Sequence, residues 1–410
     1  LFTKNQQFML TIDSDVLSPE TAKINTLSSY NFNHKTNPIS MGTTIAFLDN
    51  AGNHSRFWEM ARVLREGEPD VIDQSKIVSN YFDKDLVKIS NSRENGLIFF
   101  SKKNDNTLYG FRYLSTSDKR LQQAWFTWDF SGAIQHHAIL DDALYVVIRD
   151  SGKDTMQKLS IKRDTDTTTV TDDLDTVATA DDITYDIHLD NSKVIPAADV
   201  MYASDGRSKI FLPDGFNIPR PSTDDKYRKL VVYCHQADST SSSTQAVQDS
   251  DLIGSYAETI YQGPDSDGKY MVAWDGDWTG HDIILGYLFE MEVQFPTFYK
   301  TQLGPDSAKA DVHGSLVLHR VKINFGANGV YSTTIARTGK PTYTETWEPS
   351  PADSYRSNQV AITKQSTKSI PIYEKNTNVD FKLTSSHPSP ATLYSLTWEG
   401  EYTNNFYNRV

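Results

Sequence analysis

Four similar hairpins recur along the first 161 residues, and this repeat constrains the fold more than any other feature of the sequence. Each unit is an apolar segment, a polar turn and an amphipathic segment, and the apolar segments are residues 1–4, 44–48, 97–101 and 144–148. The steps between the equivalent positions are 43, 53 and 47 residues for Phe2, Ile45, Ile98 and Tyr145. Four-stranded propeller blades produce hairpins at steps of about 40–50 residues. The repeat therefore predicts a β-propeller, with an unevenly spaced β-sandwich as the alternative.

The composition indicates an all-β chain. Tyr, Phe and Trp make up 11% of the 410 residues, and Thr, Val and Ile are abundant between short polar stretches. Aromatic and β-branched side chains suit half-buried pleated strands, whereas Asp, Asn, Gly and Ser suit the turns that join them. We therefore expect short strands and few helices.

The amino-acid composition of the chain changes after Ile161. Residues 164–182 contain seven Asp and seven Thr with few apolar residues, a pattern typical of a solvated loop, and strand-like segments resume at residue 183. We expect propeller-like blades over residues 1–165, incomplete at the N-terminal side, and an acidic linker at 166–182. Residues 183–410 are expected to form a β-rich platform, either a barrel or a sandwich.

The charge balance limits the classes of partner. The chain has 40 Lys and Arg against 53 Asp and Glu, a formal net charge of −13. Tight nucleic-acid binding needs Lys and Arg that displace counterions, so the chain is a poor candidate for clamping nucleic acid through its phosphates, although nucleic acid could pass near its surface without binding. The single cysteine, Cys234, excludes an internal disulfide and a multi-cysteine metal site. No apolar run approaches the length of a membrane span.

The densest group of chemically capable side chains lies at residues 275–282. Asp275, Asp277, His281 and Asp282 offer an acid/base pair or oxygen ligands for a hard cation. The spacing matches neither a twelve-residue calcium loop nor a His-x-x-x-His zinc pattern, and two glycines favour a turn. We interpret the group as a turn and assign no catalytic, cofactor-binding or metal-binding residue.

Three other motifs have structural interpretations. His136 and His137 are adjacent in a predicted strand, so they point to opposite faces and do not easily share a metal ion. Trp125 and Trp128 are assigned to one face of a strand, where they pack between blades rather than stack bases or sugar rings. Cys234 lies in an apolar strand without a local base, which predicts a buried small residue rather than a nucleophile.

Several longer stretches carry a resemblance to a known family. They are residues 55–60, 65–70, 106–111, 125–128, 286–291, 314–320 and 393–400, with Arg409 and Val410 at the end. Over these stretches, which extend across most of the chain, the sequence resembles the tail tubular protein B family. These are the tail nozzle proteins of short-tailed (podovirus) bacteriophages. The shared patterns are structural rather than catalytic.

The resemblance implies a structural virion protein rather than an enzyme, and it implies no cofactor. Members of the family form a homohexameric ring at the tip of the short non-contractile tail, below an adaptor ring and beside the tail fibres. The ring is the distal part of the DNA-ejection channel, retains the genome and opens on infection. Members are longer than 410 residues and combine a propeller-like domain with β-rich platform regions. We expect part of the negative charge to face the channel.

Two other classes of function stay open on the sequence alone. A propeller-type hydrolase of host-surface glycans needs paired carboxylates in a pocket, and the group at residues 275–282 is the only sequence feature that supports this alternative. A receptor-binding tail module is the second alternative, with the polar stretch at residues 239–244 as an exposed loop.

Overall fold

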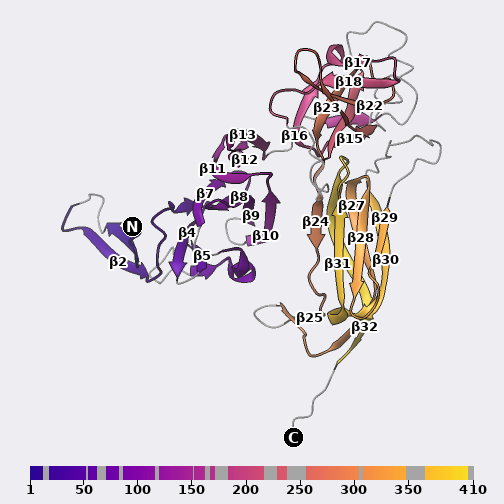
Figure 1. The fold of residues 1–410 in the computed structure, drawn as a ribbon. Helices are drawn as coiled ribbons and strands as arrows, with labels where there is room; N and C mark the ends of the chain where they lie inside the picture. Colours follow the sequence, from indigo (N-terminus) through magenta and orange to yellow (C-terminus); the bar gives the residue numbers. More distant parts are fainter. Residues whose placement is uncertain are drawn as a thin grey trace. The chain divides into compact units, whose positions relative to one another are not determined.

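The chain is almost entirely antiparallel β-structure, which confirms the all-β prediction. The computed structural model describes residues 1–12, 18–51, 54–61, 71–82, 86–115, 120–150, 152–161, 167–170, 183–216, 229–237, 255–303, 308–347 and 365–404. It divides into two compact units, Leu1–Asp164 and Thr165–Val410 (Figure 1). The helices of the described residues are short 3₁₀ turns at Lys76–Tyr81, Ala197–Asp199 and Asn376–Asn378.

The first unit is a series of antiparallel sheets. The first sheet pairs β1 (Gln7–Ile12) with β2 (Ala22–Ser28). The second contains β3 (Ile39–Ser40), β4 (Thr44–Ala51), β5 (His54–Ala61) and β6 (Val71–Asp73). The third contains β7 (Leu86–Ser92), β8 (Leu97–Lys102), β9 (Thr107–Ser115) and β10 (Arg120–Asp129). The fourth contains β11 (Ala133–Leu140), β12 (Ala143–Asp150) and β13 (Lys153–Ser160).

Strands that follow each other in the chain lie next to each other in these sheets, as in propeller blades. The predicted hairpins β4–β5, β8–β9 and β12–β13 are confirmed. The first predicted hairpin forms only a short bridge: Phe2 pairs with Gln7, and the backbone N–H of Phe8 donates to the carbonyl of Leu1 at 2.8 Å, whereas β1 pairs along its whole length with β2. The backbone N–H of Thr3 donates to the carbonyl of Gln6 at 2.9 Å and closes the turn of this short bridge.

Aromatic side chains pack the sheets of the first unit face to face. Between the β3–β6 and β7–β10 sheets, the rings of Phe57 and Phe100 lie 5.0 Å apart at 72°. On its other face, the β7–β10 sheet packs Phe99 and Leu108 against Leu144 of the β11–β13 sheet. Because β8 is covered on both faces, all of residues 97–101 are buried, which explains a continuous apolar strand in place of an alternating one.

The two tryptophans of β10 lie on opposite faces, so the prediction that they share one face is wrong. They are three positions apart, and the period of two in a strand separates them. Trp125 packs on Phe111, with ring centroids 4.6 Å apart, whereas Trp128 packs on Phe99 at 5.4 Å. Trp125 thus packs in the core between the β3–β6 and β7–β10 sheets. Trp128 instead packs on Phe99, which belongs to the core between the β7–β10 and β11–β13 sheets.

The second unit begins with a sandwich of two four-stranded sheets. One sheet has the order β16 (Asp190–Ile195), β23 (His281–Tyr287), β19 (Leu230–Ala237) and β20 (Tyr256–Glu258). The other has the order β17 (Met201–Tyr202), β18 (Arg207–Phe211), β22 (Tyr270–Asp275) and β21 (Ile260–Pro264). Their shared core contains Val232, Cys234, Trp274 and Leu285.

A second sandwich follows, drawn in orange and yellow in Figure 1. One sheet has the order β24 (Met291–Gln294), β31 (Val379–Ser385), β28 (Tyr331–Arg337) and β29 (Tyr343–Trp347). The other has the order β30 (Ser366–Lys375), β27 (Ser315–Asn328) and β32 (Ala391–Thr403). Phe325 of β27 stacks on Tyr331 of β28 at 4.4 Å within the core that joins them. Among the described residues the sheets stay open, so the platform is built of sandwiches instead of a closed barrel.

Two small ribbons complete the second unit. They are β14 (Thr167–Val170) with β15 (Ile183–Asp186), and β25 (Thr301–Leu303) with β26 (Ala308–Ala310). Strand β14 lies inside the predicted acidic linker, whereas residues 166 and 171–182 of that linker lie outside the described residues. Residues 239–244 also lie outside them. Nowhere in the described ranges does a helix have the length and apolar character needed to cross a membrane.

Candidate functional site

The carboxylates at residues 275–282 are used within the turn that joins β22 to β23. Asp275 is 82% exposed and its Oδ1 accepts from Nε of Arg207 at 2.9 Å. Oδ1 of Asp277 accepts from the backbone N–H and the hydroxyl of Thr279, at 3.1 and 2.7 Å. Asp275 is therefore one half of a surface ion pair, and Asp277 stabilises the turn.

The other two members of the group are the first two residues of β23 and are bonded to backbone groups. His281 is buried, and its Nδ1 lies 3.2 Å from the carbonyl oxygen of Thr279. Oδ1 of Asp282 accepts from the backbone N–H of Ala197 at 2.8 Å, at the start of the 3₁₀ helix Ala197–Asp199. Across the described residues, no three His, Cys, Asp or Glu side chains are grouped as a metal site requires.

The adjacent histidines of β11 point to opposite faces, as the strand geometry predicts. His136 is exposed, whereas His137 is 1% exposed, and its Nδ1 is hydrogen-bonded to Oγ of Ser90 on β7. Burial lowers the pKa of His137 to about 3, and the positive charges of Lys88 and His136 add to this effect. His137 is therefore a neutral side chain that links two sheets.

The cysteine is buried, as its apolar strand predicts. Cys234 lies in the core of the first sandwich with no exposed surface. Burial, followed by the charge of Asp282, raises the pKa of its thiol. A protonated, enclosed thiol is unsuited to nucleophilic attack.

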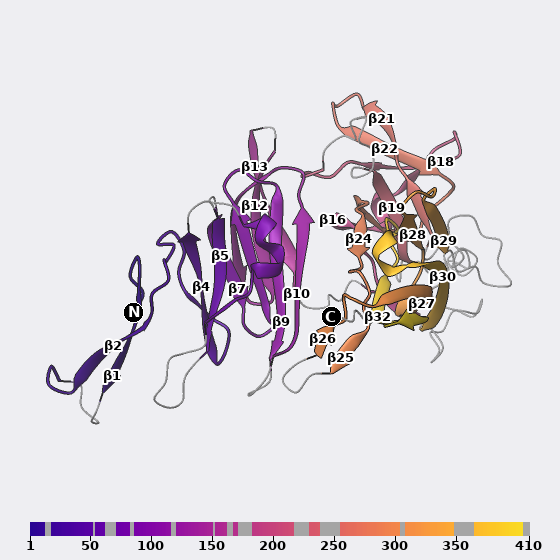
Figure 2. The same cartoon turned by 90° about the horizontal axis from the view of Figure 1, so that it is seen from below.

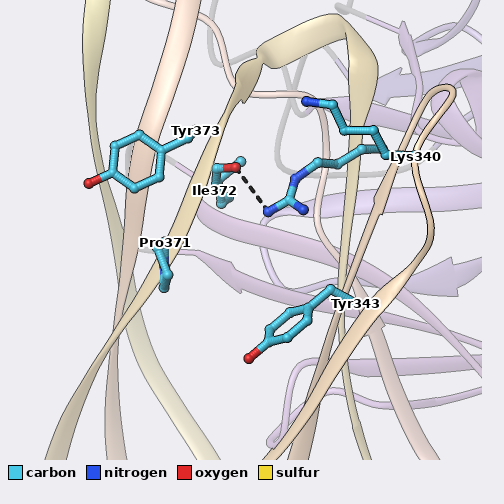
Figure 3. A pocket seen from close by; sticks show the side chains of 6 residues that line it. Lys340, Tyr343, Pro371, Ile372 and Tyr373 are labelled. Atoms are coloured by element: carbon cyan, nitrogen blue, oxygen red, sulfur yellow. Dashed lines mark hydrogen bonds between the residues drawn. The ribbon is translucent and has the colours of Figure 1, made fainter.

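A shallow groove of about 500 Å³ lies on the second sandwich (Figure 3). Its lining residues are Arg337, Lys340, Tyr343, Pro371, Ile372 and Tyr373. Both cations are engaged by the protein itself: Nη2 of Arg337 donates to the carbonyl of Ile372 at 3.0 Å, and Nζ of Lys340 pairs with Glu374 at 2.6 Å. These two contacts therefore hold the turn between β28 and β29 against β30, and they occupy the cations that line the groove.

A β-bulge shapes one side of this groove. Leu318 of β27 pairs with Glu374 and Arg320 pairs with Pro371, so β30 has one residue more than its partner over this step. Tyr373, at φ +48°, takes up the extra residue in a left-handed conformation, and its ring stacks on His319 at 5.8 Å. The bulge was not predicted from the sequence, although Pro371 inside β30 is a signal for it, since a proline within a strand marks an edge or a bulge.

The net charge is confined to one unit. Residues 1–164 contain 20 Lys and Arg and 20 Asp and Glu, whereas residues 165–410 contain 20 and 33, a difference of −13. Within the second unit, residues 165–300 contain 9 basic and 24 acidic residues, net −15, and residues 301–410 contain 11 and 9, net +2. The negative charge therefore belongs to the first sandwich and the segment that precedes it.

Three of the nine basic residues of this acidic region are paired locally. Arg207 pairs with Asp275 at 2.9 Å, Lys209 with Asp205 at 2.9 Å, and Lys229 with Glu258 at 2.6 Å. Such pairs leave the excess of carboxylates to set the surface potential. Residues 165–300 are therefore strongly acidic in sequence.

Blade-like sheets in series followed by two β-sandwiches define an all-β protein with no metal-ligand cluster among the described residues. Residues 1–409 match the family model described as bacteriophage nozzle protein, and the chain belongs to that family. It is therefore a structural protein of the bacteriophage virion, located in the tail.

Other comparisons add little. No curated protein matches the chain. Among solved structures, an exo-β-1,3-galactanase from Phanerochaete chrysosporium with galactose aligns at 9% identity, over 94% of this chain and 98% of that chain, with a TM-score of 0.21. A variant of that enzyme with β-1,3-galactotriose aligns at 10% identity, over 95% and 98%, with a TM-score of 0.20. Similarity this low carries no argument about function.

Proposed function

We propose that this chain forms part of the tail nozzle, the distal section of the DNA-ejection channel, which retains the packaged genome and opens on infection. The observation that carries the proposal, beside family membership, is the confinement of the net charge to the second unit. A wall rich in Lys and Arg would hold phosphates through counterion release. An acidic wall repels DNA weakly, over about 8–10 Å at physiological salt, and lets it slide.

In this proposal the first sandwich and the segment before it line the channel. Residues 165–300 carry a net charge of −15, and three of their nine basic residues, Arg207, Lys209 and Lys229, are already in ion pairs. Few cations therefore remain to bind the DNA backbone. Phage DNA passes through the lumen without specific binding.

The proposed assembly is a homohexameric ring at the tip of a short non-contractile tail. It sits below an adaptor ring and has the tail fibres as neighbours. Family membership supports this arrangement, and so does the first unit, whose equal numbers of charges let copies approach without net repulsion.

In the proposed nozzle, each of three segments of the chain forms a different part of the protein. Residues 1–165 form propeller-like blades, residues 166–182 an acidic connection, and residues 183–410 the platform. The boundary between the two compact units, at residues 164 and 165, supports this division.

Ejection from virions tests the lining of the channel. Asp214 and Asp267 are exposed in the acidic region, whereas Glu20 and Glu94 are exposed in the first unit. We expect the double variant D214K/D267K to slow DNA ejection, more strongly at low salt, because it adds cations to the wall. The variant E20K/E94K makes the same change in charge and should eject DNA at the normal rate. Equal rates for D214K/D267K and wild-type virions would contradict the proposed lining.

Electron microscopy of the purified protein with its adaptor tests the ring. The expected result is a six-fold ring with a central lumen, attached to the adaptor. Isolated monomers that do not attach to the adaptor contradict the nozzle proposal.

A further inference from the structure

The groove on the second sandwich, which lies between strands seen from below in Figure 2, is bordered by two exposed tyrosine side chains. Tyr373, near the end of β30, is 65% exposed, and Tyr343, at the start of β29, is 48% exposed. Figure 3 shows Pro371 and Ile372 between the two rings. Neither tyrosine hydroxyl has a hydrogen-bond partner in the part of the chain that the structure describes. Each side chain therefore offers an aromatic face and a hydroxyl group to a ligand.

The ring of Tyr373 is placed by a backbone conformation that bulky residues rarely adopt. Its φ of +48° lies in the left-handed region. The other non-glycine residues with positive φ in the described ranges are Asn104, Asp141 and Asn191, whose short polar side chains tolerate this conformation. The Tyr373 ring stacks on His319, with ring centroids 5.8 Å apart, and most of its surface stays exposed. Backbone strain of this kind is concentrated at ligand-binding and catalytic sites.

Arg337 brings a positive charge to the groove, and no carboxylate of the described residues pairs with it. Its hydrogen bond to the carbonyl of Ile372 uses one of the five N–H donors of the guanidinium group. Its Nε is buried without a hydrogen-bond partner among those residues, whereas the side chain as a whole is partly exposed. A guanidinium group fixed in this way is suited to a carboxylate or a phosphate, which its planar fork binds through two parallel hydrogen bonds.

The groove also carries a hydrogen-bond acceptor beside its donors. The exposed side chain of Lys340 pairs with Glu374, with Nζ and Oε2 2.6 Å apart. Sugar hydroxyls both donate and accept hydrogen bonds, whereas the phosphates of a nucleic acid strand only accept them. A nucleic acid strand also needs several cations that are not paired with carboxylates. A donor and an acceptor side by side next to aromatic rings therefore fit a sugar better than a nucleic acid.

An extended peptide fits this groove poorly. β29 and β30 are edge strands of their sheets. β30 carries Pro371, which has no backbone N–H, and Lys368, whose Nζ pairs with Glu345 of β29 at 3.0 Å. Proline and lysine on an edge discourage the addition of another strand. The volume of about 500 Å³ is within the range of small-molecule sites.

We propose that this groove binds an acidic sugar, meaning a sugar ring that carries a carboxylate or a phosphate group. The apolar face of the sugar packs on the rings of Tyr343 and Tyr373, and its acidic group binds Arg337. Residues 301–410 have a net charge of +2, so this part of the chain does not repel an anion as the acidic residues 165–300 do. The inference goes beyond the proposed nozzle and does not require a ring.

Saturation-transfer NMR of the purified protein with matched sugars tests the site. Glucuronate and glucose 6-phosphate are compared with glucose, and galacturonate with galactose, so that each acidic sugar has its neutral counterpart. We expect at least one acidic sugar to bind more strongly than its counterpart, and this binding to weaken at high salt because the charges are partly exposed. The carboxylate and phosphate members distinguish the two kinds of acidic group.

Three outcomes of this measurement overturn the proposal. They are binding of none of the acidic sugars, equal binding of acidic and neutral sugars, and stronger binding of a thymidine dinucleotide than of every sugar. The last outcome would assign the groove to nucleic acid.

Tyr373→Asn separates a role in binding from a role in stability. Asparagine adopts the left-handed conformation more readily than tyrosine, so the urea midpoint should not fall. The dissociation constant of the acidic sugar should rise about tenfold, because the aromatic face is lost. The matched control is Tyr394→Asn: Tyr394 is 66% exposed on β32 of the same sandwich and does not line the groove, so binding should be unchanged. A lower urea midpoint with unchanged binding would give Tyr373 a purely structural role and overturn the proposal.

Arg337→Lys tests the contact with the acidic group. Lysine keeps the positive charge but loses the planar fork, so the acidic sugar should bind about tenfold more weakly while its neutral counterpart is unaffected. Circular dichroism checks that the variant is folded, because it also loses the hydrogen bond to Ile372. Undiminished binding of the acidic sugar by the folded variant would contradict the proposal.

The outcome for this site is distinguishable from the outcome for the nozzle. Six-fold rings on the adaptor, formed by a protein that binds none of these sugars, would leave the nozzle function standing and reject only the sugar site. Sugar binding by a protein that forms no ring would contradict the nozzle function instead.

Discussion

His137 of β11 and Ser90 of β7 are joined by a hydrogen bond that links two neighbouring sheets of the first unit. His137 is 1% exposed, and its Nε2 has no hydrogen-bond partner among the described residues. The imidazole is therefore held neutral in a place where a charge would be poorly solvated. Protonation of this side chain opposes the packing of the two sheets.

Acid should destabilise the first unit through His137. Its pKa is about 3 in the folded protein, below the ordinary value of 6.5, so the unfolded chain binds the additional proton between these values. The free energy of unfolding therefore falls as the pH drops below 6.5, by about 2–3 kcal/mol at pH 4.5. Urea midpoints at pH 7 and 4.5 measure this. His137→Gln should show a smaller difference between the two pH values, whereas His136→Gln should behave as wild type. An equal difference in all three proteins would contradict the prediction.

Replacement of Asp49 should strongly destabilise the second sheet of the first unit. Asp49 is fully buried; its Oδ1 accepts from the backbone N–H of Arg56 at 2.9 Å, and its Oδ2 from Nε1 of Trp58 at 2.7 Å. Asp49→Ala leaves these buried donors unpaired, and we expect a loss of about 2–4 kcal/mol in urea unfolding. The matched control is Asp154→Ala, which removes an exposed ion pair with Arg149 and should leave the midpoint unchanged. A similar midpoint for both variants is the contradictory outcome.

A side chain at position 110 should clash with Phe126. Gly110 on β9 lies opposite Phe126 on β10, and a Cβ atom built at Gly110 meets the ring at 2.1 Å. Gly110→Ala should therefore destabilise the protein by about 1–3 kcal/mol. Phe126→Leu removes the ring, so the double variant should lose less than the sum of the two single variants. Strict additivity in a double-mutant cycle would show that the ring does not cover Gly110.

The carboxylates of the β22–β23 turn should have no catalytic effect. Asp275 pairs with Arg207, and Asp277 accepts hydrogen bonds from Thr279. We expect no release of reducing sugars from host-surface polysaccharide by the wild-type protein or by D275N/D277N. Cleavage by the wild-type protein that is lost in a folded D275N/D277N variant would support a glycan hydrolase.

Local patterns along the chain predicted much of the fold. The all-β composition, the hairpins β4–β5, β8–β9 and β12–β13, and the opposite directions of His136 and His137 follow from strand period and short turns. These features depend on residues that are close together in the sequence. The burial of Cys234 follows from the apolar strand around it.

Other features depend on partners that are distant in the sequence. Strand β1 pairs beyond the next turn with β2, Tyr373 lies in a left-handed conformation because β30 has an extra residue opposite β27, and Ser90 meets His137 across two sheets. No local pattern specifies which of several similar strands or faces will be neighbours. The same holds for the candidate site near residue 275. Asp275 bonds to Arg207 and Asp282 bonds to the backbone of Ala197, and neither partner is close to these carboxylates in the sequence.

The sequence by itself determined the strands, the repeat of hairpins and the total charge of −13. Only the tertiary structure decided which sides of the sheets are covered, and it assigned that charge to the second of two compact units. The physical reason is that the strand period depends on residues adjacent in the sequence, and the total charge is a sum over all residues. The covering of a face depends instead on packing between sheets formed by residues far apart in the chain.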